Sequence, residues 1–144
     1  MNSKTIGATG EQIAENFLKQ KGYRILDKNY AISFGNRLTR AEIDLVAQEK
    51  ETIVFVEVKT IRQTKNQDIF TFFPGYKVNW QKQQKIIRAG QTWLTKHQIP
   101  LDRPWRLDLL IVKIDPAKNK AEVQHFPNVA LRWRKEKFYY NGVF

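Results

Sequence analysis

The chain has 144 residues, of which 42% are hydrophobic and 12% aromatic, so it is long enough for one folded domain and too apolar for a disordered segment. Its 25 Lys and Arg residues outnumber its 14 Asp and Glu residues, and the net charge of +11 favours polyanionic partners, nucleic acid first. The absence of cysteine excludes disulfides, thiolate nucleophiles and zinc ribbons, so a metal site would consist mainly of carboxylates, which select Mg2+, Mn2+ or Ca2+.

The first predicted element is a helix over residues 9 to 21. Thr9 and Gln12 have the spacing of a capping box, and Gly22 is placed to end the helix. The stretch "YRILDKNYAI" then predicts a strand that leads into the polar loop "SFGNRLTR".

The later elements are also visible as patterns in the chain. They are strands at about 42–47 and 52–60, a mobile basic and aromatic loop at about 61–79, a helix at 79–97, a central strand at 105–114, an edge strand at 121–126, and a basic, aromatic C-terminal segment at 131–144. We expect one domain over residues 1–144, with an α/β fold in which helices flank a mixed central sheet.

The stretch "AEIDLVAQEKETIVFVEVKT", residues 41–60, places charges inside a strand that is otherwise apolar. Alternation puts Glu57 and Lys59 on one face of that strand. If the two strands form a hairpin with an even loop, Asp44 falls across from Glu57, and Glu42 falls across from Lys59. Two carboxylates in that arrangement repel each other unless a cation lies between them.

A divalent cation would remove this repulsion. The carboxylates of Asp44 and Glu57, a backbone carbonyl assigned to Val58, and water form a suitable oxygen site for Mg2+ or Mn2+. Lys59 would then lie beside the ion's water and the anionic oxygens of a substrate, a layout that suits phosphodiester hydrolysis. The simpler explanation is a solvated sheet face with a cross-strand salt bridge.

Asp44, followed after twelve residues by Glu57-Val58-Lys59, resembles the PD-(D/E)XK motif of the restriction-endonuclease-like superfamily. Over most of its length the chain is similar to the YraN-like uncharacterised protein family. The matching segments are "GATGEQIAENFLKQKGYRILDKNY", "AEIDLVA", "IVFVEVKT", "VNWQKQQKIIRAGQTWL" and "RLDLL". The resemblance implies a restriction-endonuclease-like core and Mg2+- or Mn2+-dependent cleavage of phosphodiester bonds.

The resemblance also implies roles for individual residues. Asp44 and Glu57 would be metal ligands, and Lys59 would be the catalytic lysine. Glu11 would reach the site from the first helix, although an acid favoured by the dipole in the first turn of a helix explains it equally well. Glu42 belongs to the same motif as Asp44 and is assigned to the catalytic group.

Basic residues near the proposed site are assigned to nucleic-acid binding. They are Arg62, Lys77, Lys82, Lys85 and Arg88. Within 61–79, aromatic residues interleave with basic residues. The aromatic rings would stack on nucleobases, which suits a branched or single-stranded substrate. Lys85 and Arg88 are explained more simply as solvated helix residues. The basic and aromatic segment 131–144 could bind nucleic acid, but a homodimer contact explains it equally well.

The predicted function is that of a metal-dependent DNA endonuclease that selects structure rather than sequence, because no groove-reading recognition helix is present. The alternative is a non-catalytic nucleic-acid-binding accessory protein of DNA recombination or uptake. No stretch approaches the roughly 20 apolar residues of a transmembrane helix, and the N-terminus lacks the apolar core of a signal peptide. We therefore expect a cytoplasmic protein with no membrane partner.

On the strand at 105–114, Arg106 and Asp108 share a face. We predict that they form a structural pair.

Overall fold

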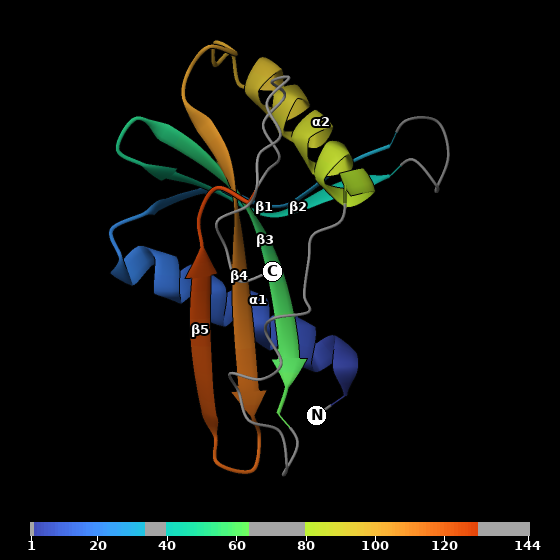
Figure 1. Ribbon diagram of the computed structural model, residues 1–144, viewed down its shortest axis with the longest axis vertical. Helices are drawn as coiled ribbons and strands as arrows, with labels where there is room; N and C mark the ends of the chain where they lie inside the picture. The colour runs from blue at the N-terminus through green and yellow to red at the C-terminus, as the bar shows by residue number, and fades with distance from the viewer. Residues whose placement is uncertain (1, 34–39, 64–79, 130–144) are drawn as a thin grey trace.

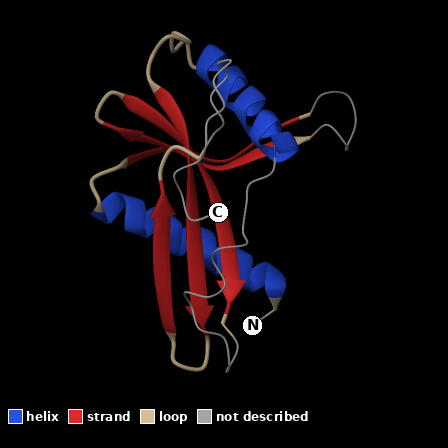
Figure 2. Cartoon of the chain, in the orientation of Figure 1, coloured by secondary structure: helices blue, strands red, loops and turns tan. Residues whose placement is uncertain are grey.

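The computed structural model describes residues 2–33, 40–63 and 80–129, which form three layers (Figures 1 and 2). The middle layer is a five-stranded mixed sheet with the order β1-β2-β3-β4-β5. The strands are β1 (Arg24–Ile32), β2 (Ala41–Glu49), β3 (Thr52–Arg62), β4 (Trp105–Asp115) and β5 (Lys120–Phe126). Helix α1 (Ser3–Gln20) covers one face of the sheet, and helix α2 (Trp80–Lys96) covers the other.

Strand β3 lies at the centre of both cores because its apolar side chains alternate between the two faces. Ile53 and Phe55 pack beneath α2, whereas Val54 and Val56 pack beneath α1. Strand β4 is parallel to β3, with Val56 opposite Asp108, and α2 is the crossover between these two strands. This architecture confirms the predicted mixed sheet flanked by helices.

The β2–β3 hairpin has the predicted register but is paired over a shorter length than expected. Its ladder runs from Glu49 opposite Thr52 to Leu45 opposite Val56 and ends there. Strand β2 stays paired with β1 further along, as far as Ala41 opposite Ile32. The part of β2 that precedes Leu45 is therefore not paired with β3, and a gap lies beside the second half of β3.

Strict alternation of faces does not hold along this part of β2. It would put Ile43 and Leu45 on one face, but Ile43 belongs to the core beneath α2 and Leu45 to the core beneath α1. The change of face coincides with the point where β2 separates from β3. Both residues are buried, so the hydrophobic pattern identified the strand correctly without revealing its local twist.

The predicted start of the first helix at residue 9, with Thr9 as its cap, was also wrong. Helix α1 begins at Ser3, and the Oδ1 atom of Asn2 accepts a hydrogen bond of 2.8 Å from the backbone N–H of Thr5. The predicted end is confirmed by Gly22, whose φ of 91° lies in the region that favours glycine.

The loop expected at 61–79 begins later than predicted, because β3 continues through Arg62. Residues 64–79 and the C-terminal segment 131–144 lie outside the described residues. Neither described helix is both long and apolar enough to cross a membrane.

Each helix approaches β3 through a glycine. A Cβ atom added at Gly10 of α1 would lie 1.9 Å from the Oγ1 atom of Thr60, and one added at Gly90 of α2 would lie 2.6 Å from a ring carbon of Phe55. Real atoms do not approach so closely, so any other residue would push the helix away from the strand. The contact at Gly10 also places the next residue, Glu11, beside the second half of β3.

Substitution of Gly10 by alanine should therefore destabilise the protein by about 1 to 3 kcal/mol through overpacking against Thr60. Gly7 lies on the same helix with nothing within 4 Å of the added Cβ atom, so Gly7→Ala should stabilise the protein by up to about 1 kcal/mol through helix propensity. Urea denaturation measures both changes. Equal effects of the two substitutions would contradict the close contact.

Candidate active site

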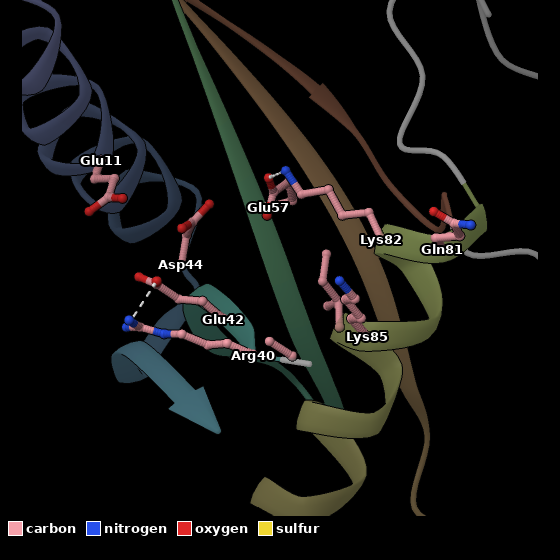
Figure 3. Close-up of a pocket in the computed structure, with 10 residues that line it drawn as sticks. Glu11, Arg40, Glu42, Asp44, Glu57, Gln81, Lys82 and Lys85 are labelled. Carbon is pink, nitrogen blue, oxygen red and sulfur yellow. Dashed lines mark ion pairs between the residues drawn. The ribbon is translucent and has the colours of Figure 1, made fainter. Parts of the chain in front are cut away.

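A pocket of about 600 Å³ lies where β2 and β3 separate, between α1 and α2 (Figure 3). Its lining combines both signs of charge. The carboxylates are Glu11, Glu42, Asp44 and Glu57, and the basic groups are Arg40, Lys82 and Lys85. The acids come from α1, β2 and β3, while both lysines come from α2, so the pocket has an acidic side and a basic side.

Asp44 is held in place by the backbone of the neighbouring strand. Its Oδ2 atom accepts a hydrogen bond of 2.7 Å from the N–H of Val58, just beyond the last ladder pair. The N–H and C=O groups of one strand residue point to the same neighbouring strand, so the Val58 carbonyl also faces this gap. The three predicted oxygen donors, from Asp44, Glu57 and Val58, thus come to one region of the structure.

The acidic side of the pocket is electrostatically unfavourable by itself. Burial, and next the charge of Glu57, raise the pKa of Asp44 to about 8, even though the hydrogen bond from Val58 acts in the opposite direction. Burial likewise raises the pKa of Glu11, with further contributions from Glu42 and Glu57. The surroundings of Asp44 therefore favour its protonated form and would favour a positive charge placed beside it.

The positive charge that balances the carboxylate of Glu57 comes from helix α2. Its side chain is only 8% exposed, and its Oε1 atom forms an ion pair with the Nζ atom of Lys82 on α2 (Figure 3). A buried carboxylate without such a partner would be costly. The more exposed pair of Arg40 with Glu42, at 3.7 Å, contributes less because water screens it.

The predicted site residues are only partly brought together. Glu11, Glu42, Asp44 and Glu57 line one pocket, as do Lys82 and Lys85. Lys59 and Arg62 are exposed on β3 and are not among the residues that line it. Arg88 is exposed further along α2, and Lys77 lies outside the described residues.

The oxygen donors suit a hard divalent cation, but they do not form a complete carboxylate cage. Within residues 2–33, 40–63 and 80–129, no three carboxylate or imidazole groups are arranged to hold one metal ion. Asp44, Glu57 and the Val58 carbonyl could hold Mg2+ or Mn2+ if water completed the shell, which is how proteins commonly bind Mg2+. The raised pKa of Asp44 indicates that this position lacks positive charge.

Sequence reasoning missed two features of the pocket. Lys82 was assigned to phosphate, whereas in the structure it pairs with Glu57, and Arg40 was not assigned at all. The spacing of Lys82 and Lys85 places both on one side of a helix, which is the only signal in the chain that they act together.

A second buried charged cluster lies away from this pocket. The carboxylate of Asp108 is fully buried and binds the guanidinium of Arg106, with an Nε–Oδ1 distance of 2.9 Å. It also lies 2.7 Å from His125 Nε2 and accepts a hydrogen bond of 2.9 Å from the N–H of Asn128. The predicted pairing of Arg106 with Asp108 is therefore confirmed.

Comparisons with known proteins agree with one another. The family model described as "Uncharacterised protein family UPF0102" matches residues 10–112. The chain is similar to a UPF0102 protein of Caldanaerobacter subterraneus subsp. tengcongensis, with 40% identity over 129 residues that cover 89% of this chain and 96% of the relative. A UPF0102 protein of Alkaliphilus oremlandii is 40% identical over 126 residues, which cover 88% and 97% of the two chains.

The raised pKa of Asp44 predicts how its substitution by asparagine affects stability. Ionisation of Asp44 disfavours the fold, and this penalty is absent below pH 4, grows as the pH rises, and levels off above about pH 8. Asparagine keeps an oxygen for the Val58 N–H and carries no charge. Asp44→Asn should therefore stabilise the protein at pH 8.5 by about 1 to 3 kcal/mol, since one pKa unit corresponds to about 1.4 kcal/mol and water at the pocket reduces the full value.

Denaturation of both proteins from pH 4 to pH 9, without divalent metal, measures this effect. The difference in unfolding free energy should vanish near pH 4. A difference that does not change with pH would mean that Asp44 ionises normally in the fold.

Proposed function

The chain belongs to the uncharacterised protein family UPF0102, and we propose that it is a metal-dependent nuclease that hydrolyses phosphodiester bonds in DNA. This membership confirms the resemblance to the YraN-like family that the sequence predicted. The relatives are named only as UPF0102 proteins, so the proposed activity depends on the pocket. The finer assignment of the fold to the restriction-endonuclease-like superfamily forms part of the same proposal.

One observation carries the proposal: Asp44 and Glu57 come from two different strands into one pocket whose opposite side bears lysines. Both acids favour a nearby positive charge: the pKa of Asp44 is raised by burial and by the charge of Glu57, and Glu57 pairs with the ammonium of Lys82. A divalent cation would replace both. When bound there, Mg2+ or Mn2+ supplies Lewis acidity and lowers the pKa of a coordinated water.

The remaining chemistry would come from basic side chains. If Glu57 held the metal, Lys82 would exchange its contact with Glu57 for an oxygen of the scissile phosphate, and Lys85 lines the same side of the pocket. Lys59 shares the sheet face of Glu57, two residues further along, and would stabilise charge that develops on the phosphate. The contacts proposed here involve only phosphate, so cleavage would follow the structure of the DNA and not its sequence.

The Glu57–Lys82 ion pair also supports a second function. A protein that binds nucleic acid without cutting it needs no metal, and this ion pair already neutralises Glu57. Such a protein would keep the basic surface as an accessory in DNA recombination or uptake. Cleavage assays separate the two functions.

Incubation with branched, single-stranded and duplex DNA plus Mn2+ should lead to cleavage by the wild-type protein. Asp44→Asn should reduce the rate by at least about 10²-fold, because it removes a preorganised charged group. Glu122→Gln, a neutralisation of an exposed acid on β5, is the matched control and should cleave normally. Binding of DNA without cleavage by the wild-type protein would favour the second function.

Metal binding can be tested without any substrate. A ligand present at 100 times its Kd stabilises the folded state by about 2.7 kcal/mol, so saturating Mn2+ should raise the Tm of the wild-type protein and of Glu122→Gln. Asp44→Asn should show a much smaller rise. Equal shifts in all three proteins would place the metal outside this pocket.

A further inference from the structure

The outer face of α2 is polar along its whole length and carries one sign of charge. The helix contains four basic residues and no acidic residue. Its buried side is formed mainly by apolar residues such as Ile86, Ile87, Trp93 and Leu94. The exposed residues are Gln81, Lys82, Lys85, Arg88, Gln91, Thr92, Thr95 and Lys96.

These exposed residues recur every three or four positions and therefore form one stripe along the helix. Lys82 and Lys85 line the basic side of the pocket at one end. Further along, Arg88 and Lys96 line a separate shallow depression of about 560 Å³ together with Gln91, Thr92 and Thr95. At 1.5 Å per residue, the stripe extends about 21 Å from Lys82 to Lys96.

The hydrogen bonds of the two threonines limit what the stripe can contact. The Oγ1 atom of Thr92 donates to the carbonyl of Arg88 at 3.0 Å, and that of Thr95 donates to the carbonyl of Gln91 at 2.9 Å. Both hydroxyl protons are therefore already used. Besides these hydroxyls, the stripe presents cationic groups and the amides of Gln81 and Gln91, a set that suits phosphate oxygens and contains no charged acceptor for the amino groups of bases.

An anionic membrane surface is a poorer fit to this stripe. A helix that binds a membrane inserts an apolar face into the lipid. The apolar face of α2 is buried against the sheet, and the exposed face of the helix offers no large hydrophobic side chain among its described residues. A chain of phosphates that leads to the pocket matches both the charge and the position of the stripe.

We propose that the exposed face of α2 is a track for a nucleic-acid backbone, which crosses Lys96 and Arg88 and enters the pocket at Lys85 and Lys82. The inference rests on the proposed function and adds the path by which the substrate reaches the site. Binding along this track is independent of base sequence and is driven by the release of counterions.

The test compares two double variants that lose the same charge. Arg88→Gln/Lys96→Gln neutralises the track, and glutamine has a helix propensity close to that of both residues. Lys118→Gln/Lys120→Gln neutralises two exposed lysines at the β4–β5 turn, which Figure 1 places at the other end of the molecule from α2. Circular dichroism and urea denaturation confirm that both variants fold.

Binding of a single-stranded and a duplex oligonucleotide is measured in EDTA over a range of salt concentrations. The track variant should reduce the slope of log K against log[salt] by about 1.4 for the single strand and about 1.8 for the duplex, the release from two phosphates. The control variant should keep the wild-type slope. Equal changes in both variants would overturn the track, because binding would then follow net charge alone.

Two further results separate the track from the nuclease proposal. If the track variant loses binding while the wild-type protein cleaves nothing with Mn2+, the track stands and the nuclease proposal fails. If the wild-type protein cleaves and the track variant binds with an unchanged slope, the track fails and the nuclease proposal stands. Loss of binding only to phosphatidylserine vesicles, with DNA binding unchanged, would also overturn the track.

Discussion

The hydrogen bond from the Val58 N–H to the Asp44 carboxylate is the interaction on which the pocket depends. Where β2 leaves β3, the central strand has a backbone donor that no longer has a ladder partner, and such a group must be satisfied. The carboxylate of Asp44 satisfies it, at the cost of bringing a half-buried acid close to the buried Glu57. The raised pKa of Asp44 and the ion pair of Glu57 with Lys82 both follow from this placement.

Close packing of the helices provides the other constraint. Gly10 and Gly90 allow α1 and α2 to lie almost directly on β3, from opposite faces. The close approach at Gly10 brings Glu11 to the acidic side of the pocket. The close approach at Gly90 brings α2 near enough for Lys82 to form its ion pair with Glu57. The charged groups therefore converge because the backbones are close, in a region where helix–sheet packing leaves little freedom.

The sequence was sufficient wherever local periodicity decides the outcome. The alternation from Ile53 to Glu57 and the even loop of the hairpin were enough to predict that Asp44 and Glu57 lie in one region, and both line the same pocket. The start of α1 was missed because Gly7 and Gly10 weaken the helical pattern, while the cap at Asn2 is separated from Ile6 by three polar residues. The separation of β2 from β3 and the Glu57–Lys82 pair depend on tertiary packing, which no periodicity encodes.

The two central acids of the pocket lie close together in the sequence, whereas the lysine that pairs with Glu57 comes from a more distant segment. Asp44 and Glu57 belong to one hairpin, whereas Lys82 belongs to α2, the crossover helix that connects β3 to β4 and packs on one face of the sheet. Contacts that are short in sequence form sooner than distant ones during folding. The carboxylates would therefore come together before their lysine arrives, so the repulsion between them would be stronger early in folding than in the finished protein, where Lys82 lies beside Glu57.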